Sequence, residues 1–514
     1  MRKAAQFFSI VVFLLFMSGC GSQSQVTTTP VSPPNPADVP VSLTITDTPP
    51  AGVTVLFFQL SITGATLSPG SVSLLSSTNP IPVNVSQLQT DSAFLDSKNV
   101  PAGTYTSLSL TFANPQLTIF NGSGATIGTG ANACDNNKVC QLTPTTTPLM
   151  LTFSTAPFPV TLAANTPLGL KLDIHLNTVI QPDLTVNLAA TNGVTISQLP
   201  PPNASGGPIA KLGHLSGTIQ SIGTNLFGLQ SGNGRTVSIG VDSSTTYKGF
   251  PTSATCSTEA FSCLAVGQIV KVEVSLLAGG TLLADEVDYA QPPGQTVVEG
   301  NILRLSTSGG NTVMDLVPQQ GPPTPTPNVL PFGQRVTVTV PPTGVTYAVD
   351  SGSFAIPDGL SFASASDLQV GQQVQVVVQG SVTTASSSSS STPITAAAAI
   401  TFTTNSIKLE PSQITGSVAA VNASALSFTL STLPVFFVPA AATASAPPIP
   451  APVNITVQTT EATTFSPTTL TISGLKVNDV VSVGGWIFST PSSSPKVTLA
   501  AKAVLDRGSV TPLF

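Results

Sequence analysis

The sequence predicts an all-β protein, with an N-terminal sandwich-like domain followed by three small β-barrel repeats of the oligomer-binding (OB) kind. The first observation is a repeated motif: LAVGQIVKVEV at residues 264–274 recurs as LQVGQQVQVVV at 368–378 and as LKVNDVVSVGG at 475–485. In each copy a turn precedes apolar residues at alternate positions, which is the period of a half-buried strand. The second observation is that short apolar runs between residues 41 and 200 are separated by Gly, Pro and Asn, without a convincing amphipathic helix.

Length and composition limit the classes of protein that the chain can belong to. Its 514 residues exceed what one hydrophobic core usually serves, so several domains of about 100 to 150 residues are expected. Charged residues make up 7% of the chain, where globular proteins average about 25%. The net charge of −6 provides no basic surface for nucleic acid. We therefore expect a neutral, hydroxyl-rich surface and no nucleic-acid partner.

The N-terminus carries the most specific signal. Arg2 and Lys3 precede an apolar run at residues 7–17, which is shorter than the roughly 20 residues that span a bilayer, and Cys20 follows two small residues. Residues 1–20 resemble a lipoprotein signal peptide, which implies a diacylglyceryl group on Cys20 and a lipid-anchored location in the cell envelope, at the outer membrane or the outer face of the cytoplasmic membrane. The alternative is an uncleaved membrane anchor in which Cys20 is incidental. The proline-containing residues 21–39 are expected to form a flexible tether.

The other four cysteines fall into two close pairs, Cys134 with Cys140 and Cys256 with Cys263. Local pairing in an exported protein favours two disulfides. The alternative is one zinc site with four cysteine ligands, but gaps of five and six residues in two different domains do not match the usual ligand spacing. No metal or other cofactor is expected.

Residues 40–200 form the expected sandwich-like domain. The segments TDTP at 46–49 and VPAGTY at 100–105 resemble an N-terminal bacterial lipoprotein domain family of uncharacterised function, and the resemblance implies a sandwich-like fold. Tyr105 is expected to bury its ring while its hydroxyl reaches a backbone partner. We expect Asp47 to cap local backbone N–H groups, with metal ligation as the alternative. His175 is interpreted as an ordinary strand residue rather than a catalytic one.

After a linker at residues 201–212, the three repeats are expected at 213–291, 296–410 and 411–508. Each repeat contains a glycine-led strand, an alternating strand, a Thr-aromatic pair, the LxV turn and an Ala-rich return strand. We expect the return strand to lie beside the first strand, which closes a barrel and removes exposed edges. The repeats resemble tandem small β-barrel domains of uncharacterised function in bacterial envelope proteins, and the third departs from the motif at Asn478 and Gly484. We expect linkers, rather than a shared core, to join the units.

No motif for known catalytic chemistry occurs: the sequence lacks a G-x-S-x-G elbow, a phosphate loop, HExxH and a calcium loop. The acidic residues Asp285, Glu286 and Asp288 are expected to divide between two faces of a strand. Trp486 is interpreted as a core residue, with a sugar-stacking platform as the alternative. The expected function is that of a non-catalytic, lipid-anchored envelope protein that displays β modules for binding or adhesion, with a protein or glycan ligand. The alternative is a glycan-acting envelope hydrolase with dispersed carboxylates about 5 to 10 Å apart.

Overall fold

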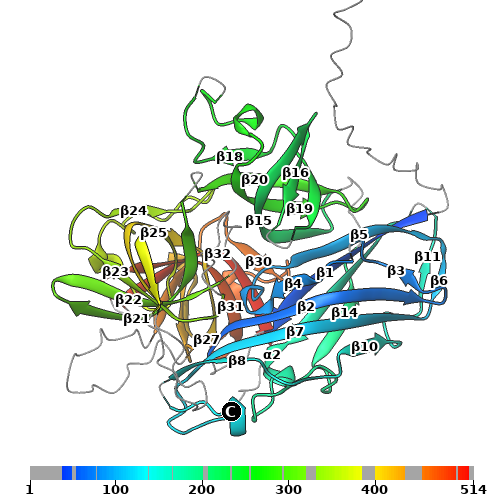
Figure 1. Ribbon diagram of the computed structural model, residues 1–514, viewed down its shortest axis with the longest axis horizontal. Coiled ribbons are helices and arrows are strands. Elements are labelled where there is room, and N and C mark those ends of the chain that lie inside the picture. Colours follow the sequence, from blue (N-terminus) through cyan, green and yellow to red (C-terminus); the bar gives the residue numbers. More distant parts are fainter. Residues whose placement is uncertain are drawn as a thin grey trace, which may run out of the picture. The chain divides into compact units, whose positions relative to one another are not determined.

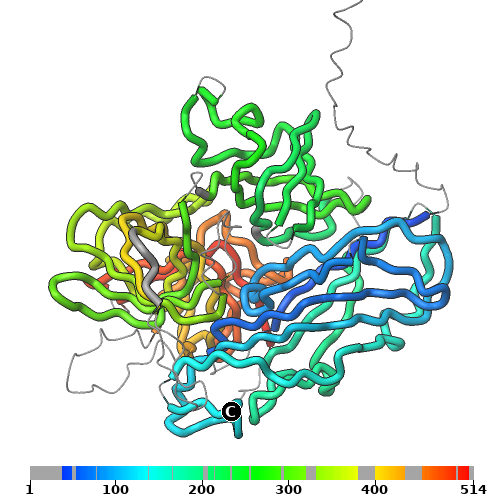
Figure 2. The backbone as a smooth tube through the Cα atoms, in the orientation of Figure 1, coloured from blue at the N-terminus to red at the C-terminus, as the bar shows by residue number. Residues whose placement is uncertain are grey.

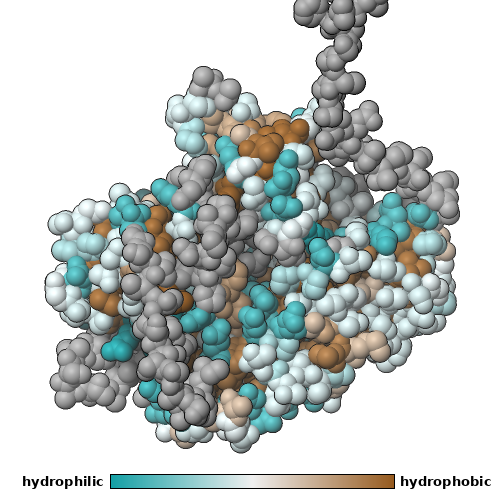
Figure 3. Space-filling view, viewed as in Figure 1, coloured by the Kyte–Doolittle hydropathy of each residue, from teal (hydrophilic) through white to brown (hydrophobic). Residues whose placement is uncertain are grey.

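The computed structural model is almost entirely β, as the sequence predicts. In the part of the chain that it describes, no helix is long and apolar enough to cross a bilayer. The visible face in Figure 3 is mostly pale, the colour of intermediate hydropathy, which fits a composition rich in Ser, Thr and Gly. The structure describes residues 38–48, 54–76, 78–136, 138–164, 166–200, 207–231, 234–253, 256–291, 295–319, 332–384, 400–434, 454–493 and 496–508.

The N-terminal domain is a sandwich of two main sheets (Figure 1). The first sheet has the order β14 (Val194–Gln198), β12 (Leu168–His175), β1 (Asp38–Thr48), β5 (Ala93–Pro101). The second has the order β10 (Met150–Phe153), β7 (Ser107–Asn121), β2 (Thr54–Ser68), β3 (Val72–Ser73), with β4 (Ile81–Asn84) on β2 and β8 (Lys138–Leu142) on β7. Side chains from both sheets form one apolar cluster, which includes Leu43, Phe58, Leu110 and Leu172, each 0% exposed.

Short elements complete this domain. Two small ladders pair β6 (Gly103–Tyr105) with β11 (Val160–Leu162) and β9 (Thr146–Thr147) with β13 (Val186–Asn187). The helical turns are η1 (Val85–Gln87), η2 (Gly130–Asn132) and α2 (Leu176–Val179).

The first barrel, drawn in green in Figure 2, is a closed ring of five strands. Its ring order is β17, β16, β15, β19, β20, and the parallel pairing of β17 with β20 closes it. The return strand therefore closes against the third strand, and the expectation that it lies beside the first is wrong, because β19 occupies that edge of β15. The elements are β15 (Ala210–Gly223), β16 (Leu226–Gln230), β17 (Thr236–Gly240), β18 (Thr246–Lys248), η3 (Phe261–Cys263), β19 (Ile269–Leu276) and β20 (Leu282–Gln291).

The other two repeats have the same strand order and the same parallel closure. The second barrel comprises β21 (Val297–Ser308), β22 (Asn311–Pro318), β23 (Val336–Val340), β24 (Thr346–Val349), η4 (Ala365–Asp367), β25 (Gln373–Thr384) and β26 (Ile400–Glu410). The third comprises β27 (Ser412–Asn422), η5 (Ala423–Ala425), β28 (Ser427–Ser431), β29 (Ile455–Gln458), β30 (Thr464–Ser466), η7 (Ile472–Gly474), β31 (Val480–Ser489) and β32 (Val497–Gly508).

The repeated sequence motif has a structural reason in each barrel. The fourth residue of the LxV turn has a positive φ, which favours Gly or Asn, and its N–H donates to a carbonyl at an irregularity of the first strand. Asn478 therefore preserves the geometry of the glycine that it replaces. The three bonds, each of 2.8 Å, run from Gly267 to Ile219, from Gly371 to Ile302 and from Asn478 to Val418.

The glycine that opens each repeat is needed for close packing. A Cβ atom on Gly217 would lie 2.5 Å from the Gln230 oxygen, and the equivalent Cβ atoms would lie 2.4 Å (Gly300) and 2.7 Å (Gly416) from carbonyl oxygens. The valines of the motif are inward, since Val272, Val376 and Val483 are each 0% exposed. The third repeat keeps its pairing, and Gly485, not Gly484, takes the register position of Val274.

The units are joined by more than linkers, which corrects the sequence-based expectation. Trp486 and Phe488 of β31 belong to the apolar cluster of the second barrel. Trp486 donates from Nε1 to the Asp350 carbonyl at 2.8 Å and stacks on Phe354 with 5.0 Å between ring centroids. The tryptophan is therefore a core residue, as expected, but the core that it fills belongs partly to the neighbouring repeat.

One short segment of the sandwich domain, residues 84–97, makes polar contacts with all three barrels. Because a single segment serves three partners, the domains are held by specific side-chain contacts as well as by chain connectivity. Examples are the hydrogen bonds of Asn84 with Gln319 (2.8 Å) and of Thr90 with Gln413 (3.1 Å), and the ion pair of Asp96 with Arg235 (3.2 Å).

Candidate functional site

The predicted lipidation site, Cys20, lies outside the described residues. The two predicted disulfides, Cys134–Cys140 and Cys256–Cys263, are both present. The four cysteines are therefore not the ligands of one zinc ion. No group of three or more His, Cys, Asp or Glu side chains within the described ranges is arranged to hold a metal ion.

Two singled-out residues of the sandwich domain behave as expected. Tyr105 is 5% exposed and donates from its hydroxyl to the Pro101 carbonyl at 3.0 Å. His175 is half-buried, with Nε2 3.4 Å from the Thr195 hydroxyl and 3.9 Å from the Asp173 carboxylate. Both side chains therefore have polar partners within the sandwich domain.

The expected capping role of Asp47 is wrong. Asp47 lies in β1 rather than in a turn, is 0% exposed, and neither carboxylate oxygen makes a hydrogen bond of normal geometry within the described structure. Burial raises the pKa of this carboxyl well above its usual value, while the Arg507 guanidinium and, more weakly, the Leu176 backbone N–H favour the ionised form. Asp47 therefore links the sandwich domain electrostatically to the last strand of the third barrel.

The acidic triplet divides between two faces of β20, as predicted. Asp285 accepts hydrogen bonds from the Ser275 hydroxyl, whereas Glu286 and Asp288 are buried at 4% and 6% exposure. The face of β20 that carries Glu286 and Asp288 faces the second barrel. A Cβ atom on Gly352 of that barrel would lie 1.9 Å from the Glu286 carboxylate. The split between two faces thus places two carboxyl groups between two barrels.

These carboxyl groups belong to a set of charges that we call the junction cluster: Lys271, Glu286 and Asp288 of the first barrel with Glu299, Asp350 and Glu410 of the second. The Lys271 amine lies 2.9 Å from the Glu299 carboxylate and 3.1 Å from that of Glu410, and all three side chains are at most 12% exposed.

The protonation states of the junction cluster follow from burial and from neighbouring charge. Burial, followed by the Glu286 carboxylate, raises the pKa of Asp288 to about 8. Burial lowers the pKa of the Lys271 amine, but Glu299 and Glu410 outweigh it and the net shift is upward. The cluster joins two barrels by buried ion pairing, and its geometry is not that of a metal site.

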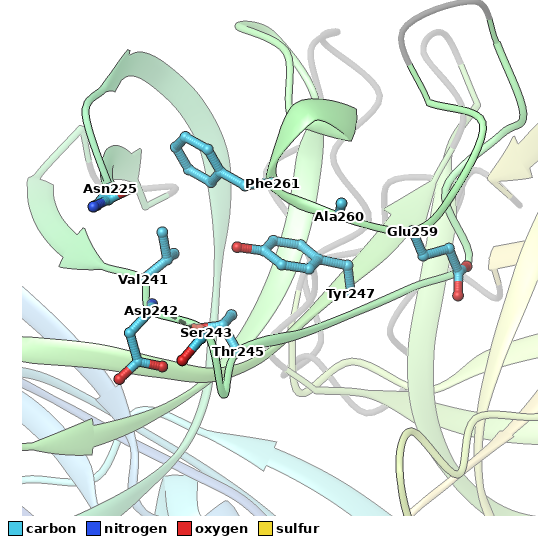
Figure 4. Close-up of a pocket in the computed structure, with 9 residues that line it drawn as sticks. All are labelled: Asn225, Val241, Asp242, Ser243, Thr245, Tyr247, Glu259, Ala260 and Phe261. Atoms are coloured by element: carbon cyan, nitrogen blue, oxygen red, sulfur yellow. Dashed lines mark hydrogen bonds between the residues drawn. The ribbon is translucent and has the colours of Figure 1, made fainter.

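The first barrel also carries a cavity of about 510 Å³ (Figure 4). It lies where the β15–β16 turn, the segment after β17, strand β18 and the loop closed by the Cys256–Cys263 disulfide meet. Its volume is in the range typical of small-molecule sites. The lining residues are Asn225, Val241, Asp242, Ser243, Thr245, Tyr247, Glu259, Ala260 and Phe261.

Tyr247 is the central polar residue of this cavity. It is 8% exposed, and its buried hydroxyl has no hydrogen-bond partner in the described structure. Figure 4 shows the hydroxyl pointing into the space between Val241 and Phe261. Burial, with a smaller contribution from the Asp242 carboxylate, raises the pKa of Tyr247 to about 12. The residue is therefore a neutral phenol, with a proton to donate, throughout the physiological range.

Local hydrogen bonds hold one side of the cavity in place. The Asp242 carboxylate accepts from the backbone N–H and the hydroxyl of Ser244 at 2.8 and 2.6 Å, and these bonds lower its pKa. The Thr245 hydroxyl donates to the Ala284 carbonyl at 2.8 Å and accepts from the Asp242 N–H at 3.0 Å. Glu259 is exposed, and in Figure 4 its carboxylate lies on the other side of the Tyr247 ring from the hydroxyl.

The sequence analysis used Tyr247 only as part of a repeated Thr-aromatic pair and did not recognise this cavity. The equivalent residues differ: Tyr347 is half-buried against Phe362, with 5.7 Å between ring centroids, and Phe465 has no hydroxyl. The sequence feature that could have indicated the cavity is the Cys256–Cys263 pair. The other repeats lack these cysteines, and their disulfide closes the loop that carries Phe261.

Two segments of the chain match family models of unknown function. Residues 39–197 match the model of a domain of unknown function (DUF4382), and residues 216–288 match another domain of unknown function (DUF5666). No curated protein matches the chain. The two matched segments coincide with the sandwich domain and the first barrel. The second and third barrels share the strand order of the first.

Proposed function

We propose that this protein is a non-catalytic, lipid-anchored component of the cell envelope that displays its β modules for binding, with the first-barrel cavity as its ligand site. The observation that carries the proposal is the Tyr247 hydroxyl, which is buried in the cavity wall without a partner. A buried polar group left unpaired costs about 1 to 3 kcal/mol, and a bound ligand that pairs with it removes this cost. The signal-peptide pattern ending at Cys20 supports the lipid anchor.

Hydrolysis of glycans is the competing function, because two carboxylates, Asp242 and Glu259, line the same cavity. Glycosidic hydrolysis needs one carboxylic acid that stays protonated near neutral pH, which usually requires an apolar or like-charged environment. Neither carboxylate has that environment: the hydrogen bonds of Asp242 with Ser244 favour its ionised form, and Glu259 is exposed to solvent. This difference favours binding over hydrolysis.

The proposal is tested with lipid-free protein comprising residues 21–514. Immobilised glycans and peptides are screened for binding, and bound species are then incubated with the protein and analysed by mass spectrometry for cleavage. Binding that Tyr247→Phe weakens and Tyr347→Phe leaves unchanged supports the proposal, because the two variants make the same chemical change in different barrels. Multiple-turnover cleavage of a glycan, or binding that neither variant affects, contradicts it.

A further inference from the structure

We propose that the first-barrel cavity binds a neutral sugar, with hydroxyl groups paired to Tyr247 and a C–H face against Phe261. This inference rests on the proposed function and specifies the ligand class of the same site. Its first support is the sign of the charge in the lining. Two of the nine lining residues, Asp242 and Glu259, are acidic, and none is Lys, Arg or His. Such a lining repels phosphates, uronates and other anions.

The second support is the hydrogen-bonding requirement of Tyr247. A neutral phenol has one proton to donate and also accepts, so complete pairing needs a ligand that supplies an acceptor as well as a donor. An ammonium or guanidinium group brings only donors and would leave the buried O–H unpaired. One sugar hydroxyl can accept from the Tyr247 O–H, and a second hydroxyl of the same ring can donate to a polar group of the lining.

The third support is the combination of apolar and polar wall. Val241 is 7% exposed and Phe261 is half-buried, and the Tyr247 hydroxyl points between them (Figure 4). The C–H face of a pyranose ring covers such apolar surface while its hydroxyls project toward polar groups. Asn225 lies at the edge of the same space and offers both an amide donor and a carbonyl acceptor.

The cavity is also pre-organised, which reduces the ordering cost of binding a small ligand. The Asp242–Ser244 hydrogen bonds and the Thr245–Ala284 bond hold the segment after β17, and the disulfide closes the opposite loop. The walls are therefore held largely in place before a ligand binds, and binding requires only a shift that makes the buried Tyr247 hydroxyl accessible.

The test uses ligand-observed NMR and calorimetry on lipid-free residues 21–514. The probes are neutral glucose, galactose, N-acetylglucosamine, maltose and cellobiose, with glucuronate, glucosamine and a lysine-containing peptide as charged comparators. The variants are Tyr247→Phe, which removes one hydroxyl, and Phe261→Ala, with Tyr347→Phe as the matched control. Tyr247→Phe removes an unpaired group and is expected to fold, which a melting curve verifies.

We expect at least one neutral sugar to bind more tightly than both charged comparators of similar size. Tyr247→Phe should weaken its affinity about tenfold, the effect of one lost hydrogen bond, and Tyr347→Phe should not change it. Preference for glucosamine or the peptide, with binding still dependent on Tyr247, overturns the sugar assignment and leaves the binding function intact. Binding of no probe at this cavity, together with no Tyr247-dependent ligand in the wider screen, overturns both.

Discussion

Replacing the buried Lys271 with methionine should destabilise the contact between the first and second barrels more than the same replacement of an exposed lysine. The variant keeps an unbranched side chain of similar length but removes the charge that lies 2.9 Å from Glu299 and 3.1 Å from Glu410. At an effective dielectric constant of 20, each attraction is about 5 kcal/mol, and the desolvation of the lysine offsets much of it. Breaking a buried pair by removing one partner typically costs about 3 to 5 kcal/mol, because the remaining charge stays buried.

The assay is urea unfolding followed by the fluorescence of Trp486, the single tryptophan, which lies between the second and third barrels. Limited proteolysis with mass spectrometry then locates the loosened segments. The matched control is Lys211→Met in the same barrel, where the lysine is 75% exposed and 3.7 Å from Asp285, and where a loss of at most about 1 kcal/mol is expected.

The pH dependence of this variant provides an independent check. Burial already raises the pKa of Glu410 and Lys271 opposes that shift, so without Lys271 this carboxyl binds a proton more readily in the folded state and the destabilisation should be smaller at pH 5 than at pH 8. Adding Glu299→Gln and Glu410→Gln should restore much of the stability, because the two carboxylates that Lys271 paired are then neutral. Equal stability of Lys271→Met and Lys211→Met, or failure of the added substitutions to restore stability, would refute the reasoning.

Three further predictions concern protonation, the barrel core and the anchor. The folded-state pKa of Asp288, about 8, exceeds its usual value of 3.8, so its contribution to the free energy of unfolding should fall as pH rises between these values. Asp288→Asn should therefore reduce the dependence of the free energy of unfolding on pH. An unchanged pH dependence would contradict the assignment. Val272→Asp should lower the free energy of unfolding by several kcal/mol and expose residues 213–290 to protease while residues 292–514 stay resistant. The control Val266→Asp, at a position 63% exposed, should change little. Collapse of all three barrels together would show that they fold as one unit. Cys20→Ala should release the protein from membranes or leave an unprocessed precursor, and mature-sized protein that still fractionates with membranes would argue against lipidation at Cys20.

The sequence alone determined the features that depend on local constraints. The inward positions of the repeat strands follow from valines at alternate positions, because a strand with one buried face has its register set by that period. Gly217, Gly300 and Gly416 mark places where a neighbouring carbonyl leaves no room for a Cβ atom. The disulfides join cysteines six and seven positions apart, so their pairing needed only sequence proximity.

Only the tertiary structure decided the features that depend on residues distant in the chain. Glu410 pairs with Lys271 across 139 positions, so nothing near either residue indicates the partner. Asp47 resembled a turn cap because its immediate neighbours are turn formers, yet its environment is set first by burial and then by the charge of Arg507, which is distant in the chain. The cavity of the first barrel is likewise formed by separate loops around Tyr247. The Tyr247 hydroxyl lacks a partner there because the packing of these loops buries it. Burial and long-range charge depend on how the domains pack, whereas strand periodicity, glycine positions and short disulfides are properties of neighbouring residues.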